Sequence, residues 1–309
     1  MKYLITGGAG FIGSNIARNL VRDGREVRIL DNFSSGRHEN VADLADKVEL
    51  IEGDIRDYWT VIKAVKGVDY VLHQAALPSV PRSVENPLTS NSVNIDGTLN
   101  MLEASKNAGV KKFVLASSSS VYGESEELPK HEGMTPSPLS PYAISKLTGE
   151  YYCRVYWQLY GFPTVSLRYF NIFGPHQDPA SQYAAVVPRF ITSLLEGKQP
   201  VVFGDGAQSR DFTYIDNCVA ANILAATSDK IVGDVFNVAC AGQYTLNELL
   251  DILREIIGVD IPAKYDPERP GDIKHSYADV KKLMKFGYNP KVSFKEGLKR
   301  TVEFFKAGR

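Results

Sequence analysis

The sequence has few cysteines and no surplus of either charge. The three cysteines, Cys153, Cys218 and Cys240, lie far apart and form no CxxC pair. Their number and spacing argue against a zinc site or a disulfide framework and favour a reducing compartment, so the cytoplasm is the expected location. Lys and Arg number 35 against 36 Asp and Glu, which gives no electrostatic case for binding nucleic acid or an anionic membrane surface.

Long apolar runs and clustered histidines are also missing. No stretch of 18 apolar residues occurs, so we expect no membrane span. The segment from Met1 to Gly7 is typical of a strand that enters a glycine turn, not of a charged leader followed by an apolar region. The histidines show no metal-ligand spacing, so no metal is predicted; they are His38, His73, His131, His176 and His275.

Short apolar runs alternate with helical patterns through the first half of the chain. This alternation predicts an α/β fold, a doubly wound parallel sheet of the Rossmann type with helices on both faces. The strands are expected at Lys2–Thr6, Glu26–Leu30, Val48–Glu52, Tyr70–His73, Phe113–Ser117 and Thr164–Tyr169, and the helices at Ile12–Asp23, Tyr58–Lys66, Ile95–Asn107 and Tyr142–Tyr160.

Beyond about residue 170 the pattern loosens, and prolines and glycines interrupt it. We expect a nucleotide-binding domain over 1–170 and a smaller, partly interleaved α/β lobe over 171–210 and 241–309. The stretch 211–240 is expected to return to the first domain, with Asp234–Val238 as a strand. A capping box at Thr245–Glu248 predicts a helix that continues through Ile257.

A glycine-rich loop follows the first expected strand and precedes the first helix. Gly7, Gly10 and Gly13 permit a tight turn and close approach of the backbone to a pyrophosphate, which the helix N-terminus would also attract. Asp31 ends the second strand, where a carboxylate suits a ribose 2′-hydroxyl and repels a 2′-phosphate. The sequence therefore predicts NAD rather than NADP. Asp54, after the third strand, is either an adenine-side contact or a plain turn residue.

Tyr142 and Lys146 are spaced to share one face of a helix. A phenol normally ionises near pH ~10, but a nearby ammonium and the positive nicotinamide ring would favour the phenolate and make it a usable base. Such a pair is common by chance, and a solvated helix face explains it equally well. Ser118 strengthens the catalytic interpretation, because it follows the fifth strand at the sheet edge where ligands bind.

Taken together, these segments resemble the extended short-chain dehydrogenase/reductase superfamily and, within it, the UDP-glucose 4-epimerase family. The resemblance covers nearly the whole chain. It is carried by Thr6–Ser14, Ala116–Gly123, Ser140–Lys146, Leu167–Gly174, Gln208–Asp216 and Arg269–Asp272.

By position, the resemblance implies a catalytic Ser118 and Tyr142 and a cofactor-binding Lys146. It places Gly7, Gly10, Phe11, Ile12, Gly13, Asp31, Asn32, Asp54, Ile55, Ala75, Asn94 and Tyr169 beside NAD, with Tyr142 and Lys146. It places Asn171, Val187, Phe203, Arg210, Arg269, Asp272 and Ser276 beside the nucleotide sugar. Phe203 is alternatively a core aromatic, and the two arginines are alternatively surface ion-pair partners of Asp211 or Glu268.

The implied reaction is a 4-epimerisation of UDP-hexoses: proton loss to Tyr142, hydride transfer at C4, turnover of a 4-keto sugar, and return of the hydride. A 4,6-dehydratase needs an acidic pair after the catalytic hydroxyl, where this chain has Ser119 and Ser120. A UDP-glucuronate 4-epimerase remains an alternative, because Arg82 could pair with a carboxylate. A non-catalytic nucleotide-sugar sensor is the alternative of another class.

Substrate size and oligomeric state also follow from the resemblance. Ser276 matches a gate position where bulk restricts the sugar, so its small side chain implies that UDP-GlcNAc and UDP-GalNAc are accepted beside UDP-glucose and UDP-galactose. The family pairs the helices Ile95–Asn107 and Tyr142–Tyr160 with a second copy as a four-helix bundle, which implies a homodimer. The aromatic residues of the second helix are otherwise explained as core packing.

Overall fold

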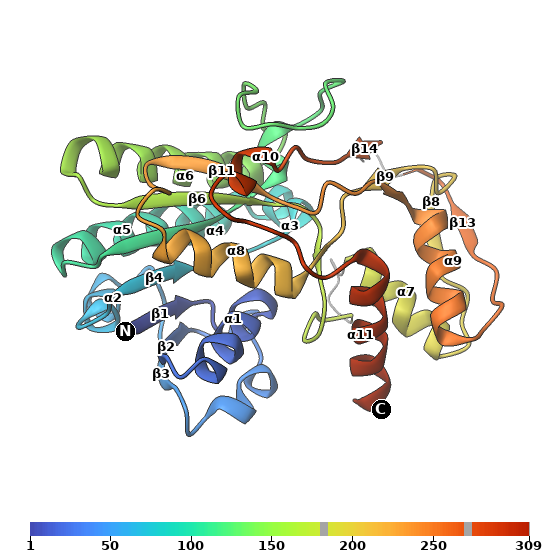
Figure 1. The fold of residues 1–309 in the computed structure, drawn as a ribbon, viewed down its shortest axis with the longest axis horizontal. Coiled ribbons are helices and arrows are strands. Elements are labelled where there is room, and N and C mark those ends of the chain that lie inside the picture. The colour runs from blue at the N-terminus through green and yellow to red at the C-terminus, as the bar shows by residue number, and fades with distance from the viewer. Residues whose placement is uncertain (180–184, 269–273, 309) are drawn as a thin grey trace.

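The computed structural model describes residues 1–179, 185–268 and 274–308. A central sheet of seven parallel strands runs in the order β11-β6-β5-β4-β1-β2-β3 (Figure 1). Its strands are β1 (Lys2–Thr6), β2 (Glu26–Asp31), β3 (Glu49–Glu52), β4 (Tyr70–His73), β5 (Lys112–Ser118), β6 (Thr164–Tyr169) and β11 (Asp234–Val238).

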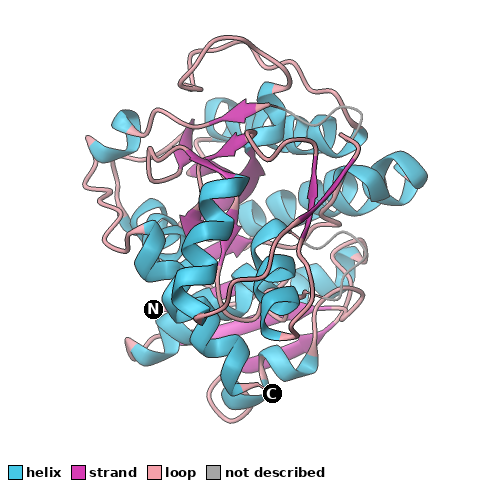
Figure 2. Ribbon diagram, turned by 90° about the vertical axis from the view of Figure 1, so that its right-hand side faces the viewer, coloured by secondary structure: helices cyan, strands magenta, loops and turns pink. Residues whose placement is uncertain are grey.

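Helices cover both faces of this sheet, which explains the continuously apolar strands. In β1, Leu4 belongs to the core under one helical layer and Ile5 to the core under the other. The Leu4 side carries α2 (Tyr58–Val65), α5 (Gly97–Asn107) and α6 (Pro141–Tyr160), and the Ile5 side carries α1 (Phe11–Arg22) and α8 (Ile215–Thr227). Figure 2 shows the strands enclosed between helices from the side.

The remaining elements of the first half connect these layers. They are the short helices α3 (Val80–Glu85) and α4 (Pro87–Asn91), the π-helical turn η3 (Ser92–Asp96), and the 3-10 turns η1 (His38–Asn40), η2 (Ala42–Leu44) and η4 (Ser119–Tyr122). Both α3 and α4 pack against α6.

A second group of elements lies beside the β11 side and the carboxyl edge of the sheet, on the right of Figure 1. It contains α7 (Val186–Leu195), α9 (Leu246–Ile257) and α11 (Phe294–Ala307), whereas α10 (Lys281–Met284) packs against β11 at the edge of the sheet. The strands of this second group form the pairs β7 (Ile172–Phe173) with β10 (Thr213–Tyr214) and β8 (Val201–Phe203) with β13 (Lys264–Asp266), and the sheet β12 (Tyr244–Thr245)–β9 (Ser209–Arg210)–β14 (His275–Ser276).

The predicted strands of the first half agree with the structure to within one residue at each end. The returning strand Asp234–Val238 is confirmed as β11, which pairs with β6 at the sheet edge. The capping box at Thr245 and Glu248 and the helix through Ile257 are confirmed as well. The helix expected from Ile95 differs: α5 begins at Gly97, and a wider π turn precedes it. Within this turn the Asn94 side chain bonds the backbone of Leu77.

Candidate functional site

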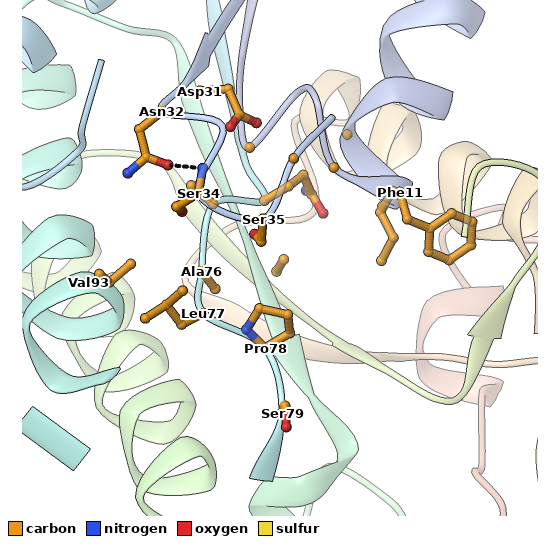
Figure 3. A pocket seen from close by; sticks show the side chains of 18 of the residues that line it. Phe11, Asp31, Asn32, Ser34, Ser35, Ala76, Leu77, Pro78, Ser79 and Val93 are labelled. Atoms are coloured by element: carbon orange, nitrogen blue, oxygen red, sulfur yellow. Dashed lines mark hydrogen bonds between the residues drawn. The ribbon is translucent and has the colours of Figure 1, made fainter. Parts of the chain in front are cut away.

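A cavity of about 410 Å³ opens at the carboxyl ends of β1, β2, β4 and β5. The strand order reverses here, since β1 leads to β2 on one side while β4 continues the sheet on the other, and such switch points are where open α/β sheets bind ligands. In Figure 3, Asp31 and Asn32 border the cavity on one side, and Ala76, Leu77 and Pro78 border it on the other.

The glycine loop forms the floor of this cavity. Gly7 has a positive φ of 67°, and a Cβ there would stand 2.7 Å from the backbone nitrogen of Ala75. A Cβ on Gly13 would overlap the Gly7 carbonyl oxygen. Helix α1 begins after Gly10, and no side chain caps it. The first N–H groups of α1 are therefore available to an anionic ligand.

Asp31 lies buried at the end of β2. One carboxylate oxygen accepts the Ala9 amide (2.9 Å) and the other accepts the Phe33 amide (2.8 Å). Burial raises the pKa of this carboxyl, and the backbone hydrogen bonds oppose that rise. The carboxylate thus ties the glycine loop to the end of β2 and still lines the cavity.

Asn32 and Asp54 meet at the next strand end. The Asn32 amide donates to the Asp54 carboxylate (2.8 Å), which also accepts the Arg56 guanidinium. The bonds from Arg56, together with that from Asn32, lower the pKa of Asp54 to about 2. Asp54 also accepts the Arg56 amide in the manner of a turn residue, so both sequence interpretations fit its position.

A buried hydrogen-bonded chain supports the wall after β4. The Thr6 hydroxyl accepts the Ala75 amide and bonds the His73 ring (2.7 Å), whose other nitrogen bonds Thr98 (3.0 Å). Burial lowers the pKa of His73 to about 3, so this ring is neutral. Asn94 does not line the cavity: its amide holds the backbone of Leu77 and the hydroxyl of Ser145.

The Tyr142–Lys146 pair also lines the cavity, from the first two turns of α6. Ser140 caps this helix by accepting the Ala143 amide (3.1 Å). The Lys146 ammonium donates to the Ala116 carbonyl (2.8 Å) and lies 5.9 Å from the centre of the Tyr142 ring. Ser118 is hydrogen-bonded to Tyr142, so the predicted trio is gathered at one point.

Burial dominates the ionisation of this trio. It raises the pKa of Tyr142, and the hydrogen bond with Ser118 opposes that rise. It lowers the pKa of Lys146 to about 8, and the charge of Glu150 opposes that fall. A positive charge close to the phenol, such as the Lys146 ammonium, opposes the effect of burial on Tyr142.

Most residues predicted for the cofactor lie together around the cavity. They are Gly7, Gly10, Phe11, Ile12, Gly13, Asp31, Asn32, Asp54, Ile55, Ala75, Tyr142, Lys146 and Tyr169. Sequence reasoning missed the loop Ser34–Arg37, the turn Leu77–Ser79 and the segment His176–Asp178, which line it too. The first two loops follow strand ends, so the rule that located Asp31 also applies to them. Arg82, considered for a uronic acid carboxylate, also lines the cavity.

The substrate candidates lie in the second group of elements. Ser276 on β14 is directly opposite Arg210 on β9, whose guanidinium donates to the Ser209 and Lys274 carbonyls. Phe203 ends β8, with the Arg189 guanidinium 5.7 Å from its ring centre. Asn171 has a positive φ of 37° and donates to the Asp211 carbonyl.

Val187 lies on α7, and its side chain is buried in the hydrophobic core. Only its backbone can therefore reach a ligand. Arg269 and Asp272 lie outside the described residues. Within the described part of the chain, no group of three or more His, Cys, Asp or Glu side chains is arranged to hold a metal ion. No described helix has the length and apolarity needed to cross a membrane.

Comparison with known proteins agrees with this architecture. Residues 3–239 match the NAD dependent epimerase/dehydratase family. The UDP-glucose 4-epimerase of Mycolicibacterium smegmatis is 38% identical over 311 residues, which is 99% of each chain. The UDP-N-acetylglucosamine 4-epimerase of Methanobrevibacter ruminantium M1, solved in complex with UDP-N-acetylmuramic acid, has a TM-score of 0.96 at 45% identity and covers 100% of this chain and 99% of its own.

A third relative bears on the cofactor. The UDP-glucose 4-epimerase of Thermus thermophilus, solved in complex with NAD, has a TM-score of 0.92 at 39% identity, with 100% of both chains covered. The predicted fold class and the resemblance to epimerases are confirmed by these matches. The family match extends over most of the chain, and the cavity lies within it: this chain belongs to the NAD-dependent epimerase/dehydratase family.

Proposed function

We propose that this chain interconverts UDP-hexoses that differ in configuration at C4, with UDP-GlcNAc and UDP-GalNAc accepted beside UDP-glucose and UDP-galactose. The observation that supports this most directly is the gathering of Tyr142, Lys146 and Ser118, since the first two line a dinucleotide-type cavity and Ser118 is bonded to Tyr142. Two of its relatives, the epimerases of Mycolicibacterium smegmatis and Methanobrevibacter ruminantium, are 4-epimerases by name, and each is matched over 99% of its length.

The cavity fits NAD. The glycine loop leaves no Cβ in the path of a pyrophosphate, and the uncapped start of α1 offers N–H groups to it. The buried Asp31 carboxylate suits a ribose diol and disfavours the phosphate of NADP. Asn32, Asp54 and Ile55 lie where they would hold the adenosine end, and Ala75, Tyr169 and Lys146 where they would hold the nicotinamide end.

The chemistry divides between the cofactor and the chain. NAD, when bound, supplies a reversible hydride acceptor for C4 of the sugar. Tyr142 takes and returns the proton of the 4-hydroxyl, and Ser118 shares a hydrogen bond with that phenol. Lys146, fixed on the Ala116 carbonyl, adds a positive charge that favours the phenolate.

The second group of elements is proposed to hold the nucleotide. The chain is then divided into two binding regions. Residues 1–170 bind the cofactor, together with 211–240, which return to this region, and residues 171–210 and 241–309 bind the UDP-sugar. Arg210 and Arg269 would clamp the diphosphate, since guanidinium forks match phosphate oxygens. The roles proposed for Asn171, Val187, Phe203, Asp272 and Ser276 follow from the same resemblance.

Two other reactions that this fold supports can be distinguished from the proposed one. A 4,6-dehydratase needs a carboxylic acid next to Ser118, and Ser119 and Ser120 provide none. A uronic acid substrate has a specific observation in its favour, because Arg82 lines the cavity. UDP-glucuronic acid therefore belongs in the first substrate panel.

A homodimer is part of the proposal. On α6, Tyr156 is buried and Tyr152 half-buried in the core, but Ile144, Tyr151, Val155 and Leu159 are exposed along one stripe of the helix. Such a stripe, with Leu159 70% exposed, is what an antiparallel pairing of α5 and α6 with a second copy would cover.

All three cysteines are free, which supports a reducing compartment such as the cytoplasm.

The test is turnover by the purified protein supplied with NAD. We expect UDP-GlcNAc to be converted to UDP-GalNAc with no added reductant. Chromatography of the two UDP-sugars measures the conversion. Tyr142→Phe should lower the rate by about 10²- to 10⁴-fold, the usual contribution of a general base. Tyr160→Phe, at an exposed tyrosine at the far end of the same helix, is the matched control and should retain the rate.

A sensor rather than an enzyme would bind NAD and UDP-sugars without interconverting them. Native rates in Tyr142→Phe, or the absence of any C4 isomerisation by the unmodified protein across the UDP-sugar panel, would contradict the proposed function.

A further inference from the structure

One turn beyond Lys146 on α6, a carboxylate is buried among charged groups. Tyr142, Lys146 and Glu150 are spaced by four residues and so share one face of the helix. Glu150 binds Arg168 of β6 through both oxygens: Nε donates to Oε1 (2.9 Å) and a terminal nitrogen donates to Oε2 (2.7 Å). The two side chains are only 6% and 3% exposed.

The same carboxylate is bonded to the catalytic strand. The Ser117 hydroxyl donates to Oε1 of Glu150. Ser117 lies between Ala116, whose carbonyl accepts the Lys146 ammonium, and Ser118. Ser117 and Arg168 are also direct partners in the pairing of β5 with β6. Glu150 therefore joins α6, β5 and β6 at the level where the Tyr142–Lys146–Ser118 trio is assembled.

Beyond Glu150, Arg168 is held by an aromatic ring. Its guanidinium lies 4.6 Å from the ring centre of Tyr122, in the turn that follows Ser118, and the Tyr122 hydroxyl donates to Asn237 of β11 (2.7 Å). A bidentate ion pair with a stacked guanidinium has little freedom to rotate. The carboxylate charge is thus fixed in one place behind Lys146.

The groups around Lys146 determine its charge state. From α6 it is faced by Tyr142 and Glu150, from β4 by the neutral His73, and from β5 by the Ala116 carbonyl. Arg168 of β6 is the ion-pair partner of Glu150. Burial lowers the pKa of Lys146 to about 8, close to physiological pH, and Glu150 is the neighbour that opposes this. An ammonium so placed keeps its proton only with help from a fixed negative charge.

We propose that Glu150, locked by Arg168 and Ser117, is a positioning residue that keeps Lys146 in its ammonium form and thereby sets the alkaline limit of activity. This inference rests on the proposed function, in which Lys146 must be charged. Glu150 does not line the cavity, so it acts through Lys146 and through the strand that carries Ser118.

The sign of the effect follows directly. If the carboxylate becomes a neutral amide, the fixed negative charge disappears while Arg168 remains, and the pKa of Lys146 falls. The ammonium is then lost at a lower pH, and the alkaline limb of the kcat profile moves to lower pH with it. A nearby charge typically shifts a buried group by one unit or more, so we expect a displacement of about one pH unit.

The experiment measures kcat between pH 6 and 10 for the NAD-loaded protein and for Glu150→Gln, Glu150→Asp and Glu103→Gln. Glu150→Gln should move the alkaline limb down. Glu150→Asp keeps the charge and should retain the limb near its native position even if stability falls. Glu103→Gln removes a carboxylate that also bonds α6, through Tyr156, but lies outside the site, and should leave the profile unchanged.

A second readout does not depend on turnover. Carbon-13 NMR of labelled lysine, with Lys146→Arg for assignment, follows the ionisation of Lys146 directly. If the native protein turns over no UDP-sugar while the Lys146 titration still moves in Glu150→Gln, the proposed function fails and the electrostatic role of Glu150 stands.

Glu150→Gln leaves the Arg168 charge buried without its carboxylate and can fail to fold. Glu150→Gln/Arg168→Met replaces the ion pair as a unit, a change that proteins often tolerate. Because Glu150, and not Arg168, is the charge that acts on the pKa of Lys146, this double variant should also titrate Lys146 at lower pH. A native Lys146 titration in the folded variants, single or double, overturns the proposal.

Discussion

At the scale of single residues, the proposed role of Ser276 is to decide by its small size which sugar is accepted. The pairing of β14 with β9 puts Ser276 directly opposite Arg210, the proposed diphosphate clamp. A ligand clamped there brings its sugar close to Ser276. Ser276→Tyr should lower turnover of UDP-GlcNAc by about tenfold or more and spare UDP-glucose, because a phenol would fill the space that a 2-acetamido group needs.

The matched control for this size effect is Ser276→Ala, which removes the hydroxyl without adding bulk. It should keep turnover of both UDP-GlcNAc and UDP-glucose near the native rates. Steady-state kinetics with each sugar separates the two cases. Unchanged UDP-GlcNAc turnover in Ser276→Tyr would show that the gate lies elsewhere.

At the scale of elements, the start of α6 is both a helix terminus and part of the site. Ser140 satisfies the Ala143 amide, and Tyr142 lies in the turn that this bond closes. Ser140→Ala should cost about 1 kcal/mol of stability. Since fraying of this turn displaces the phenol, kcat should also fall by about tenfold.

The control for that prediction is another capped helix. Thr245 caps α9 with a full capping box, away from the Tyr142–Lys146 pair. Thr245→Ala should destabilise the protein as much as Ser140→Ala does, which lowers the melting temperature by a few degrees, while kcat is retained. Equal losses of kcat in the two variants would mean that the Ser140 effect is general destabilisation.

The elements also show what could be predicted from the sequence. The strands of the first half were predictable because each is a short apolar run that fills both cores, as Leu4 and Ile5 do. The capping box at Thr245 was predictable because its two bonds are local. The π turn before α5 was not, since the Asn94 bonds to Leu77 that accompany it cross 17 residues.

The candidate site divides in the same way. Asp31 and the glycines were found because strand-end and turn rules are local. The Glu150–Arg168 pair was not found, although Glu150 lies four residues beyond Lys146, because its partner is on another strand and only the β5–β6 register brings Ser117 to it. Arg82 was noted only as an alternative, and its place in the cavity depends on the packing of α3 against α6.

At the scale of the whole molecule, helix α6 connects the site to the proposed partner. Its inner face carries Tyr142, Lys146 and Glu150, and its outer stripe carries Tyr151, Val155 and Leu159. The short helices α3 and α4, which pack on α6, add the exposed Val84 and Leu88 beside that stripe. An apolar surface on the helix that holds the proposed catalytic pair favours coverage by a second copy of the chain.

Val155→Glu/Leu159→Glu tests this arrangement. Two carboxylates placed in a desolvated helix pairing lack partners there, so the dissociation constant of the dimer should rise by about a hundredfold or more, measured by light scattering across a protein dilution series. Trp59→Glu, at a side chain 74% exposed on α2, is the control and should leave the dimer intact. If α6 needs its partner to stay rigid, kcat should fall in the variant only below the concentration at which it dissociates. A native protein that is monomeric at every concentration would refute the pairing, while its site, built within one chain, would be unaffected.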